Sequence, residues 1–583
     1  MARMRVRGWA TIVVAVVAIG LLAPAAGVSA AKPHRPQAVT QRTVKPQRIE
    51  AGLAAKARER GSVRVIVNFR KGFTASAVAS PSSRREYKSG VRTMSNRIAG
   101  ITTSTGGQVV RRFTYLPSMA VYATPRTLAA LKASPYVKSV AADTLSKPTL
   151  NESVPIVQGD TMAAAGWGGT NQIVAVLDTG VQRDHPFLAG KTVDEACFAT
   201  GYASPQPPPG PVGDCPNGAQ TQVGTGAAAP CAYSPTSCLH GTHVAGIAVG
   251  KRLTTAGPGG VPIQGVARYA SLLPIQVFSN VNSSPGAWTS DQAAGLEWLY
   301  TQRNAYGTKR IAAANLSIGS TAVTGTNCDA EPSYAPVKAA AELLRTAGIA
   351  TIYAAGNAGK LGAMSYPACL SAVISVASST KTNTISDFSN ISSFTSIIAP
   401  GTDIYSSVPG GIYSVLQGTS MAAPHVAGAW AELKSRFPKA SVNVVLQALQ
   451  ATGLSIKDER YPGYTFTRIT KKRIKILSAG NWLGATVTAL KRSVTSVKSG
   501  QTVTLTVTET SARVVGQKPT GKVQFKVGGT LKSTKTIDPV TGKATYVATI
   551  SGPKGKQVTV QAFYLGAGPF VKSQSTALKV TIK

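Results

Sequence analysis

The stretch QGTSMAAPHVAG at residues 417–428 places a serine where a tight turn meets a helix. Gly418 permits backbone conformations closed to other residues. Small and apolar residues then recur at helical spacing. We expect Pro424 near the helix start, where a missing N–H does least damage. Ser420 would therefore lie at a helix N-terminus, whose outward N–H groups can stabilise an oxyanion. An ordinary helix cap is the competing interpretation of this serine.

Two stretches upstream bear on that choice. Residues 173–181, IVAVLDTGV, read as a buried strand that ends at the carboxylate of Asp178. Residues 239–247, LHGTHVAGI, bring His240 and His243 onto one helix. Two histidines at this spacing could ligate a metal, but the motif lacks the glutamate and third ligand of a metallopeptidase. We therefore expect neither a metal nor a cofactor.

Together, LDTG at 177–180, HGTHVAG at 240–246 and GTSMAAPHVAG at 418–428 resemble the three active-site motifs of subtilisin-like serine peptidases. The order Asp, His, Ser is that of subtilisin, and the resemblance runs from about residue 150 to residue 460. It implies a catalytic triad of Asp178, His240 and Ser420. His240 would be the general base and then the general acid, and Asp178 would orient its ring.

The resemblance also implies an oxyanion site and a substrate cleft. The apolar run 349–357, IATIYAAGN, ends at Asn357, whose amide would share the oxyanion with the N–H of Ser420. The segment 316–320 resembles the edge that pairs with substrate backbone. The substrate-binding residues implied are Ser317, Ile318, Gly319, Ala354, Ala355 and Gly356. No carboxylate stands among them, so we expect a preference for neutral, apolar side chains before the cut.

Family calcium sites are not carried over to this chain. By motif alignment, Phe187 stands where many subtilisins have a calcium-binding aspartate, and an apolar ring cannot ligate a hard cation. Asp184 is near but out of register.

The organisation of the chain around these motifs predicts an α/β fold with flanking domains. In residues 150–478, apolar runs alternate with helical stretches, which predicts a subtilisin-like parallel sheet covered by helices on both faces. Residues 31–149 hold a leader and then a small α+β ferredoxin-like pattern, which resembles the propeptide that folds and inhibits such enzymes. Residues 481–583 alternate like the strands of a β-sandwich and resemble bacterial immunoglobulin-like domains. We interpret Ser478, Ala479 and Gly480 as a linker.

The N-terminus and the cysteines indicate export. Residues 1–30 have the basic start, short apolar run and small-residue end of a cleaved secretion signal. We expect no transmembrane segment in the mature chain. Six cysteines in an exported chain favour disulfides. We expect Cys328 to pair with Cys369, and the four cysteines between 197 and 238 to pair among themselves, with a zinc site as the alternative for these four.

The formal net charge is +39. No nucleic-acid-binding motif accompanies this charge, so we expect no nucleic-acid partner. Anionic cell-wall polymers are a candidate partner of the basic residues 481–583, and a mere spacer is the alternative.

Taken together, the sequence predicts a secreted serine endopeptidase made as a zymogen, with polypeptide substrates and its own propeptide as inhibitor, and with the cell wall as a candidate location. A catalytically silent adhesion protein on a peptidase fold is one alternative. A processing peptidase with one narrow target is the other.

Overall fold

The computed structural model describes residue 49 and residues 52–70, 81–112, 117–142, 150–201, 212–281, 283–460 and 468–583. The predicted secretion signal lies outside these residues. The chain divides into two compact units, Met1–Ser146 and Lys147–Lys583. Within the described residues, no helix is long and apolar enough to cross a membrane.

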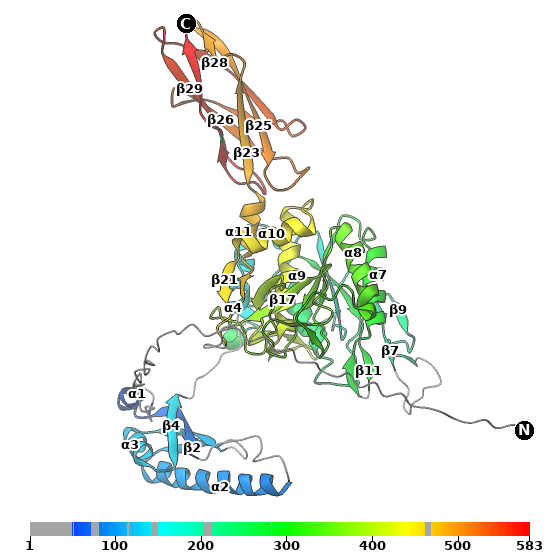
Figure 1. Ribbon diagram of the computed structural model, residues 1–583, viewed down its shortest axis with the longest axis vertical. Coiled ribbons are helices and arrows are strands. Elements are labelled where there is room, and N and C mark those ends of the chain that lie inside the picture. Colours follow the sequence, from blue (N-terminus) through cyan, green and yellow to red (C-terminus); the bar gives the residue numbers. More distant parts are fainter. Residues whose placement is uncertain are drawn as a thin grey trace, which may run out of the picture. The chain divides into compact units, whose positions relative to one another are not determined.

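The first unit is a small α+β domain (Figure 1). Its described strands form an antiparallel sheet in the order β2-β3-β1-β4, the order of a ferredoxin-like fold. One core of apolar side chains joins the sheet to its helices. The elements are α1 Leu53–Arg60, β1 Val63–Phe69, α2 Pro81–Ser104, β2 Gln108–Arg112, β3 Ser118–Ala123, α3 Pro125–Ala133 and β4 Val137–Ala142. After α1, which lies in the part of the chain that the sequence assigns to the leader, the elements follow the predicted order of strand, helix, strand, strand, helix, strand.

The second unit is built on a sheet of ten described strands. Its central strands are parallel and pair in the order β18-β17-β15-β13-β5-β10. In sheet order the strands are β21 Leu454–Lys457, β22 Thr470–Arg473, β18 Ile397–Pro400, β17 Ile374–Ser379, β15 Ala350–Ala354, β13 Arg310–Leu316, β5 Gln172–Asp178, β10 Ser271–Gln276, β6 Ala196–Phe198 and β9 Thr221–Val223.

Helices cover both faces of this sheet, as predicted. Alternate residues of the central strands pack into two separate cores because successive side chains of a strand point to opposite faces. One core holds the buried α6 and α9, and the other holds the inner sides of α7 and α8. The helices of this unit before the β-sandwich are α4 Leu150–Ile156, α5 Gly159–Ala164, α6 His240–Val249, α7 Thr289–Thr301, α8 Ala335–Thr346, α9 Thr419–Arg436, α10 Val442–Thr452 and α11 Ile476–Leu483.

Short hairpins and single strands lie around the edges of the sheet. They include the disulfide-bonded insertion and the pair β19 and β20 that packs against α6. These strands are β7 Thr200–Gly201, β8 Val212–Gly213, β11 Ser279–Val281, β12 Ser284–Gly286, β14 Val323–Thr324, β16 Met364–Ser365, β19 Ile404–Val408 and β20 Ile412–Leu416.

The six cysteines form three disulfides. Cys328 pairs with Cys369, as predicted. The other four pair among themselves as Cys197–Cys215 and Cys231–Cys238. The disulfide prediction is therefore confirmed, and the zinc alternative for these four cysteines is wrong because no thiol is left free to ligate a metal.

The C-terminal region is a β-sandwich of two sheets. Strands β23-β25-β28 form one sheet, and β24-β31-β29-β26-β27 form the other, with β30 added beside β29. Their burial alternates along the chain, as one-sided sheets require. The strands are β23 Thr486–Arg492, β24 Ser496–Val497, β25 Gln501–Ser511, β26 Lys522–Val527, β27 Thr530–Thr536, β28 Lys543–Ile550, β29 Gln557–Tyr564, β30 Ser573–Gln574 and β31 Leu578–Ile582.

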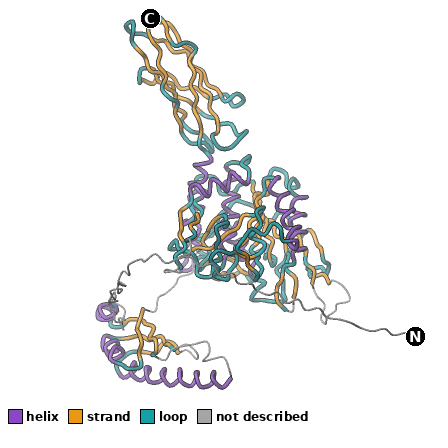
Figure 2. The backbone as a smooth tube through the Cα atoms, in the orientation of Figure 1, coloured by secondary structure: helices purple, strands orange, loops and turns teal. Residues whose placement is uncertain are grey.

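The prediction of a linker at residues 478–480 is wrong. These residues lie in the middle of α11, the helix that immediately precedes the sandwich strands (Figure 2). Ala479 and Gly480 are buried in it, and a Cβ on Gly480 would lie 2.7 Å from a guanidinium nitrogen of Arg436. Small residues here permit close helix packing, although on sequence alone the same residues are typical of a flexible connection.

Candidate active site

Four predicted site residues gather at the carboxyl ends of parallel strands, the usual place for a site in an open α/β sheet. Asp178 is the last residue of β5, and Asn357 follows β15. His240 begins α6, and Ser420 is the second residue of α9. His240, Asn357 and Ser420 line one cleft of 860 Å³, while Asp178 is fully buried behind the histidine.

Asp178 and His240 form a hydrogen-bonded pair. The Nδ1 of His240 lies 2.8 Å from Oδ1 of Asp178. That carboxylate oxygen also accepts the backbone N–H of Thr179 at 2.8 Å, which holds its orientation. Burial alone lowers the pKa of His240, but the charge and hydrogen bond of Asp178 outweigh it, so the pKa is raised above 6.5. Bonding at Nδ1 leaves Nε2 of the ring for the cleft.

The serine side chain points to Ser317, the residue that follows β13. Ser420 Oγ donates to the carbonyl of Ser317 at 3.3 Å, and no hydrogen bond joins it to His240 in the part of the chain that the structure describes. Both side chains line the same cleft, and general-base catalysis would need the serine side chain to leave this carbonyl and bond to the ring of His240.

Pro424 lies deeper in α9 than the predicted position near the start of the helix. It is the sixth residue of the helix, inside it rather than at its first turn. A proline there removes the N–H that would bond to the carbonyl of Ser420, four residues earlier. The hydroxyl of Ser317 donates to that carbonyl at 2.7 Å instead. Ser317, the residue that follows β13, therefore holds the backbone of Ser420 in place.

The side chain of Asn357 has one fixed orientation. Its Oδ1 accepts both the backbone N–H of Thr419 at 2.8 Å and the hydroxyl of Thr419 at 2.9 Å. The amide –NH₂ is thereby turned to the other side, 3.3 Å from where a Cβ on Gly418 would stand. With φ at 155°, Gly418 has a backbone that other residues rarely adopt. The amide of Asn357 and the N–H of Ser420, unbonded in the first turn of a helix, are suitable oxyanion donors.

The predicted substrate residues divide between the cleft and the core. The five that line the cleft are Ser317, Ile318, Gly319, Ala354 and Gly356. Ala355 does not, because it is fully buried on the opposite side of the sheet. Among the described lining residues, none is Asp, Glu, Lys or Arg, so the cleft is neutral apart from the histidine.

Sequence reasoning missed one wall of this cleft. Thr236 and Ser237, which lie inside the Cys231–Cys238 loop, line it, together with residues of the β11–β12 hairpin. The spacing of this cysteine pair, which ends two residues before His240, was a usable signal.

Thr179 connects the Cys231–Cys238 loop to the neighbourhood of Asp178 and His240. Its carbonyl accepts the N–H of Cys231 at 2.9 Å, and its hydroxyl donates to the carbonyl of Cys238 at 3.3 Å. The same hydroxyl accepts the N–H of Gly241 at 3.0 Å. The disulfide loop thus ties the turn after Asp178 to the first turn of the His240 helix.

The other histidines of the motifs make structural contacts. His243 Nε2 lies 3.0 Å from the carbonyl of Ile404, and burial lowers its pKa to about 3. His425 bridges the carbonyl of Met421 and the hydroxyl of Ser153, and burial lowers its pKa to about 4. Both rings are therefore neutral near pH 7.

The position aligned with a family calcium ligand is apolar in the structure as well. Phe187 is fully buried, and its ring packs edge-on to Tyr413 at a centroid distance of 5.9 Å. Within the described residues, no group of three or more acidic, histidine or cysteine side chains is arranged to hold a metal ion.

Comparison with known proteins agrees with this geometry. The model of the subtilase family matches residues 169–471, and that of the bacterial Ig-like domain (group 3) matches residues 490–583. Subtilisin DY of Bacillus licheniformis is 30% identical over 319 residues, which are 54% of this chain and 95% of the relative. Thermitase of Thermoactinomyces vulgaris is 36% identical over 273 residues, 47% of this chain and 78% of the relative. Subtilisin E of Bacillus subtilis is 28% identical over 403 residues, 67% of this chain and 91% of the relative.

The chain belongs to the subtilase family. It is a subtilisin-like serine endopeptidase that carries a bacterial immunoglobulin-like domain at its C-terminal end. The predicted domain boundaries and the roles of the individual site residues stay predictions.

Proposed function

We propose that this chain is a secreted endopeptidase, made as a zymogen, that hydrolyses extended polypeptides through Asp178, His240 and Ser420 and an acyl-enzyme intermediate. The observation that carries the proposal is the 2.8 Å bond between His240 and a buried Asp178, beside a cleft that Ser420 and Asn357 also line. A neutral structural histidine, such as His243, has carbonyl partners instead.

The chemistry follows from these positions. As Ser420 Oγ attacks the scissile carbonyl carbon, His240 Nε2 takes the hydroxyl proton, and Asp178 stabilises the imidazolium that forms. The oxyanion accepts hydrogen bonds from the amide of Asn357 and the N–H of Ser420. The C–N bond breaks as His240 gives the proton to the leaving amine. A water molecule then repeats the sequence to release the acyl group from Ser420.

The proposed substrate is an extended polypeptide with a neutral side chain before the cut. The segment Ser317–Gly319 lines the cleft and would pair with substrate backbone, a mode of binding with little sequence preference. Ala354 and Gly356 leave room for a side chain, and Ser365 lies beside them. Profiling cleavage of a mixed peptide library tests this, and dominant cutting after Arg or Lys would refute it.

The first unit is proposed to be the propeptide, which acts as an intramolecular inhibitor until it is cut off. Its ferredoxin-like strand order and its position before the peptidase domain support this. The proposed secretion signal at residues 1–30 agrees with an extracellular enzyme. We expect the maturation bond near residues 143–151, most of which lie outside the described residues.

The decisive test compares the full chain with Ser420→Ala. The variant should lose casein hydrolysis on the order of 10⁶-fold, a magnitude taken from subtilisin itself, and should retain its N-terminal unit. The matched control is Ser320→Ala, which removes another hydroxyl that lines the cleft. Equal hydrolysis and processing by the wild type and Ser420→Ala would refute the triad. No hydrolysis by either would favour the silent adhesion protein, and wild-type hydrolysis of one sequence alone would favour the narrow processing peptidase.

A second proposal concerns the C-terminal domain, which we propose binds anionic wall polymers. Residues 481–583 contain two acidic residues, Glu509 and Asp538, amid many lysines. Glu509 is 2% exposed, so Asp538 is the only carboxylate side chain at this domain's surface. Salt-sensitive retention on isolated cell walls, lost on deleting residues 481–583, would support the proposal. Retention that is unchanged by the deletion would refute it and favour a spacer.

A further inference from the structure

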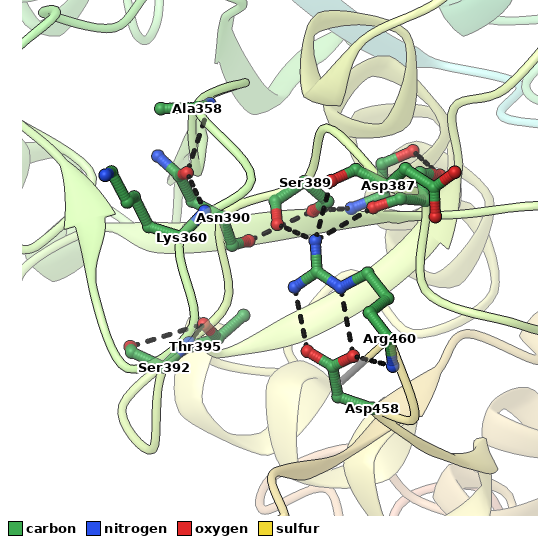
Figure 3. Close-up of polar contacts among 11 residues, drawn as sticks. Ala358, Lys360, Asp387, Ser389, Asn390, Ser392, Thr395, Asp458 and Arg460 are labelled. Carbon is green, nitrogen blue, oxygen red and sulfur yellow. Dashed lines mark hydrogen bonds and ion pairs between the residues drawn. The ribbon is translucent and has the colours of Figure 1, made fainter. Parts of the chain in front are cut away.

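A buried arginine stands behind the loop that carries Asn357, and the predicted chemistry does not use it. We call residues 355–360 the oxyanion loop and the neighbouring residues 386–391 the support loop. Figure 3 shows the guanidinium of Arg460 between the carboxylate of Asp458 and the carbonyls of the support loop.

Arg460 uses all of its guanidinium nitrogens. Nε and Nη2 bond the two oxygens of Asp458 at 3.0 and 2.8 Å, a bidentate pair. Nη1 donates to three carbonyls of the support loop, those of Ser386 at 3.1 Å, Asp387 at 3.0 Å and Ser389 at 2.7 Å. The side chains of Arg460 and Asp458 are 7% and 1% exposed. The pair therefore joins the support loop to the segment after β21 in a poorly solvated place.

The support loop in turn holds the oxyanion loop through Asn390, which is fully buried. Its Nδ2 donates to the carbonyl of Ala355 at 3.1 Å and to the hydroxyl of Ser365 at 3.2 Å. Its Oδ1 accepts the N–H groups of Ala358 at 3.2 Å and Lys360 at 2.9 Å (Figure 3). One amide side chain thus bonds the oxyanion loop on both sides of Asn357.

Backbone bonds complete this attachment. The N–H of Asn390 donates to the carbonyl of Gly356 at 2.9 Å, and that of Gly359 donates to the carbonyl of Phe388 at 2.7 Å. The N–H of Ile391 donates to the carbonyl of Lys360 at 2.9 Å. The position of Asn357 is therefore set from one side by Thr419 and from the other by the support loop.

We propose that Arg460, paired with Asp458, is a positioning residue for the oxyanion donor Asn357, acting through the support loop. The inference rests on the proposed role of Asn357 and adds the group that keeps its loop in place. Arg460 does not line the cleft, so it acts on the transition state by geometry alone. A misplacement of a catalytic group by about 1 Å can cost about 10²-fold in rate.

The kinetic test replaces the guanidinium in the full chain. Arg460→Met keeps the length of the side chain and removes its five donors. We expect kcat on a neutral peptide to fall about 10- to 100-fold with KM changed less than about threefold, because the oxyanion forms only in the transition state. Arg460→Lys should recover little, since an ammonium cannot bond Asp458 and three carbonyls in the same planar geometry.

Arg345→Met is the matched control. Arg345 is half-buried and, like Arg460, bonds loop carbonyls, those of Ala372 at 3.0 Å and Ser371 at 3.5 Å. These residues precede β17, at the end of the parallel strands opposite to the site. We expect Arg345→Met to lower the stability of the protein and to leave kcat unchanged. If Arg345→Met lowers kcat as much as Arg460→Met, the effect is general destabilisation and the inference is wrong.

Two further measurements separate this inference from the proposed function. In an Asn357→Ala background, Arg460→Met should cost less than about threefold in kcat, because the group it positions is gone. A full loss in both backgrounds would overturn the inference. Amide hydrogen exchange of residues 356–360 should become faster in Arg460→Met and not in Arg345→Met. This readout needs no activity, so unchanged exchange overturns the inference even if the chain hydrolyses nothing.

Discussion

The parallel sheet of the peptidase domain and the β-sandwich that follows it differ in how much of each sheet is exposed to solvent. Every residue of β5 is buried, because helices cover both faces of that sheet. Along β25, buried and partly exposed residues alternate, because one face is left to solvent. In the first region chemistry is therefore confined to loops at one edge of the sheet. In the second the exposed faces carry the charge, and any binding must use that surface.

The two regions should accordingly respond differently to single substitutions. In the peptidase domain a change at the sheet edge should alter the rate and spare the fold. In the sandwich a core change should alter the fold and spare the rate. Four predictions follow from this contrast, in decreasing order of effect.

Replacing Asp178 should have the largest effect. Asp178→Asn should lower kcat/KM about 10⁴-fold, because the imidazole loses the partner that sets its tautomer and stabilises its charge. Activity requires a neutral His240, and Asp178 raises the pKa of that ring above 6.5. Wild-type activity should therefore fall as the pH drops through that raised pKa, and the residual activity of the variant should persist to lower pH. An acid limb at the same pH in both proteins would contradict the ion pair's role.

Removing the amide of Asn357 should cost less. Asn357→Ala should lower kcat about 10²–10³-fold with a small change in KM, a magnitude borrowed from subtilisin. Steady-state kinetics on one neutral peptide measure both constants. The same peptide with Ser320→Ala, which removes a hydroxyl of the cleft that is not a predicted oxyanion donor, gives the baseline. A change confined to KM would assign Asn357 to substrate binding instead.

A core substitution in the sandwich should leave the rate untouched. Phe525 is fully buried and packs against Tyr546 at a centroid distance of 5.7 Å. Phe525→Ala should lower the unfolding free energy of the sandwich by about 3–5 kcal/mol. Calorimetry of the full chain should show the change, while kcat/KM on a small peptide stays within about twofold. A parallel fall in kcat/KM would mean that the two regions are not independent.

The smallest effect should come from the buried carboxyl of the sandwich. Burial raises the pKa of Glu509 above 4.5, although Ser573 donates to it at 3.0 Å. A folded-state pKa above the unfolded value favours the protonated form, so sandwich stability should rise as the pH falls from above that raised pKa toward 4.5. Glu509→Gln should flatten this part of the stability curve. The same pH dependence in the variant would show that another group causes it.

Much of the fold could be predicted from local pattern. Apolar runs predicted the buried strands β5 and β15, and alternation predicted the sandwich strands, because a side chain's surroundings repeat with the period of its element. The disulfide prediction was confirmed as well. Predictions that depended on context failed: residues 478–480 are helical, Pro424 lies inside its helix, and Ala355 faces the core.

The candidate site shows the same division. Three short motifs drew attention to Asp178, His240 and Ser420 because each motif is read within one segment of the chain. Nothing near Arg460 in the sequence indicates the support loop, which lies about 70 residues earlier in the chain. Likewise, the loop closed by Cys231 and Cys238 could be suspected from spacing, but not its contact with the turn after Asp178.

By itself, the sequence determined where the buried strands of the peptidase domain and the alternating strands of the sandwich lie, and which side chains have the chemistry of a serine peptidase. The tertiary structure alone decided which distant loops hold those side chains and which faces they use. The physical reason is the distance along the chain over which each effect acts. Propensity and periodicity act over a few residues, whereas the bonds from Arg460 to residues 386–389 and from Thr419 to Asn357 join segments 62 to 74 residues apart, and only packing brings these segments together.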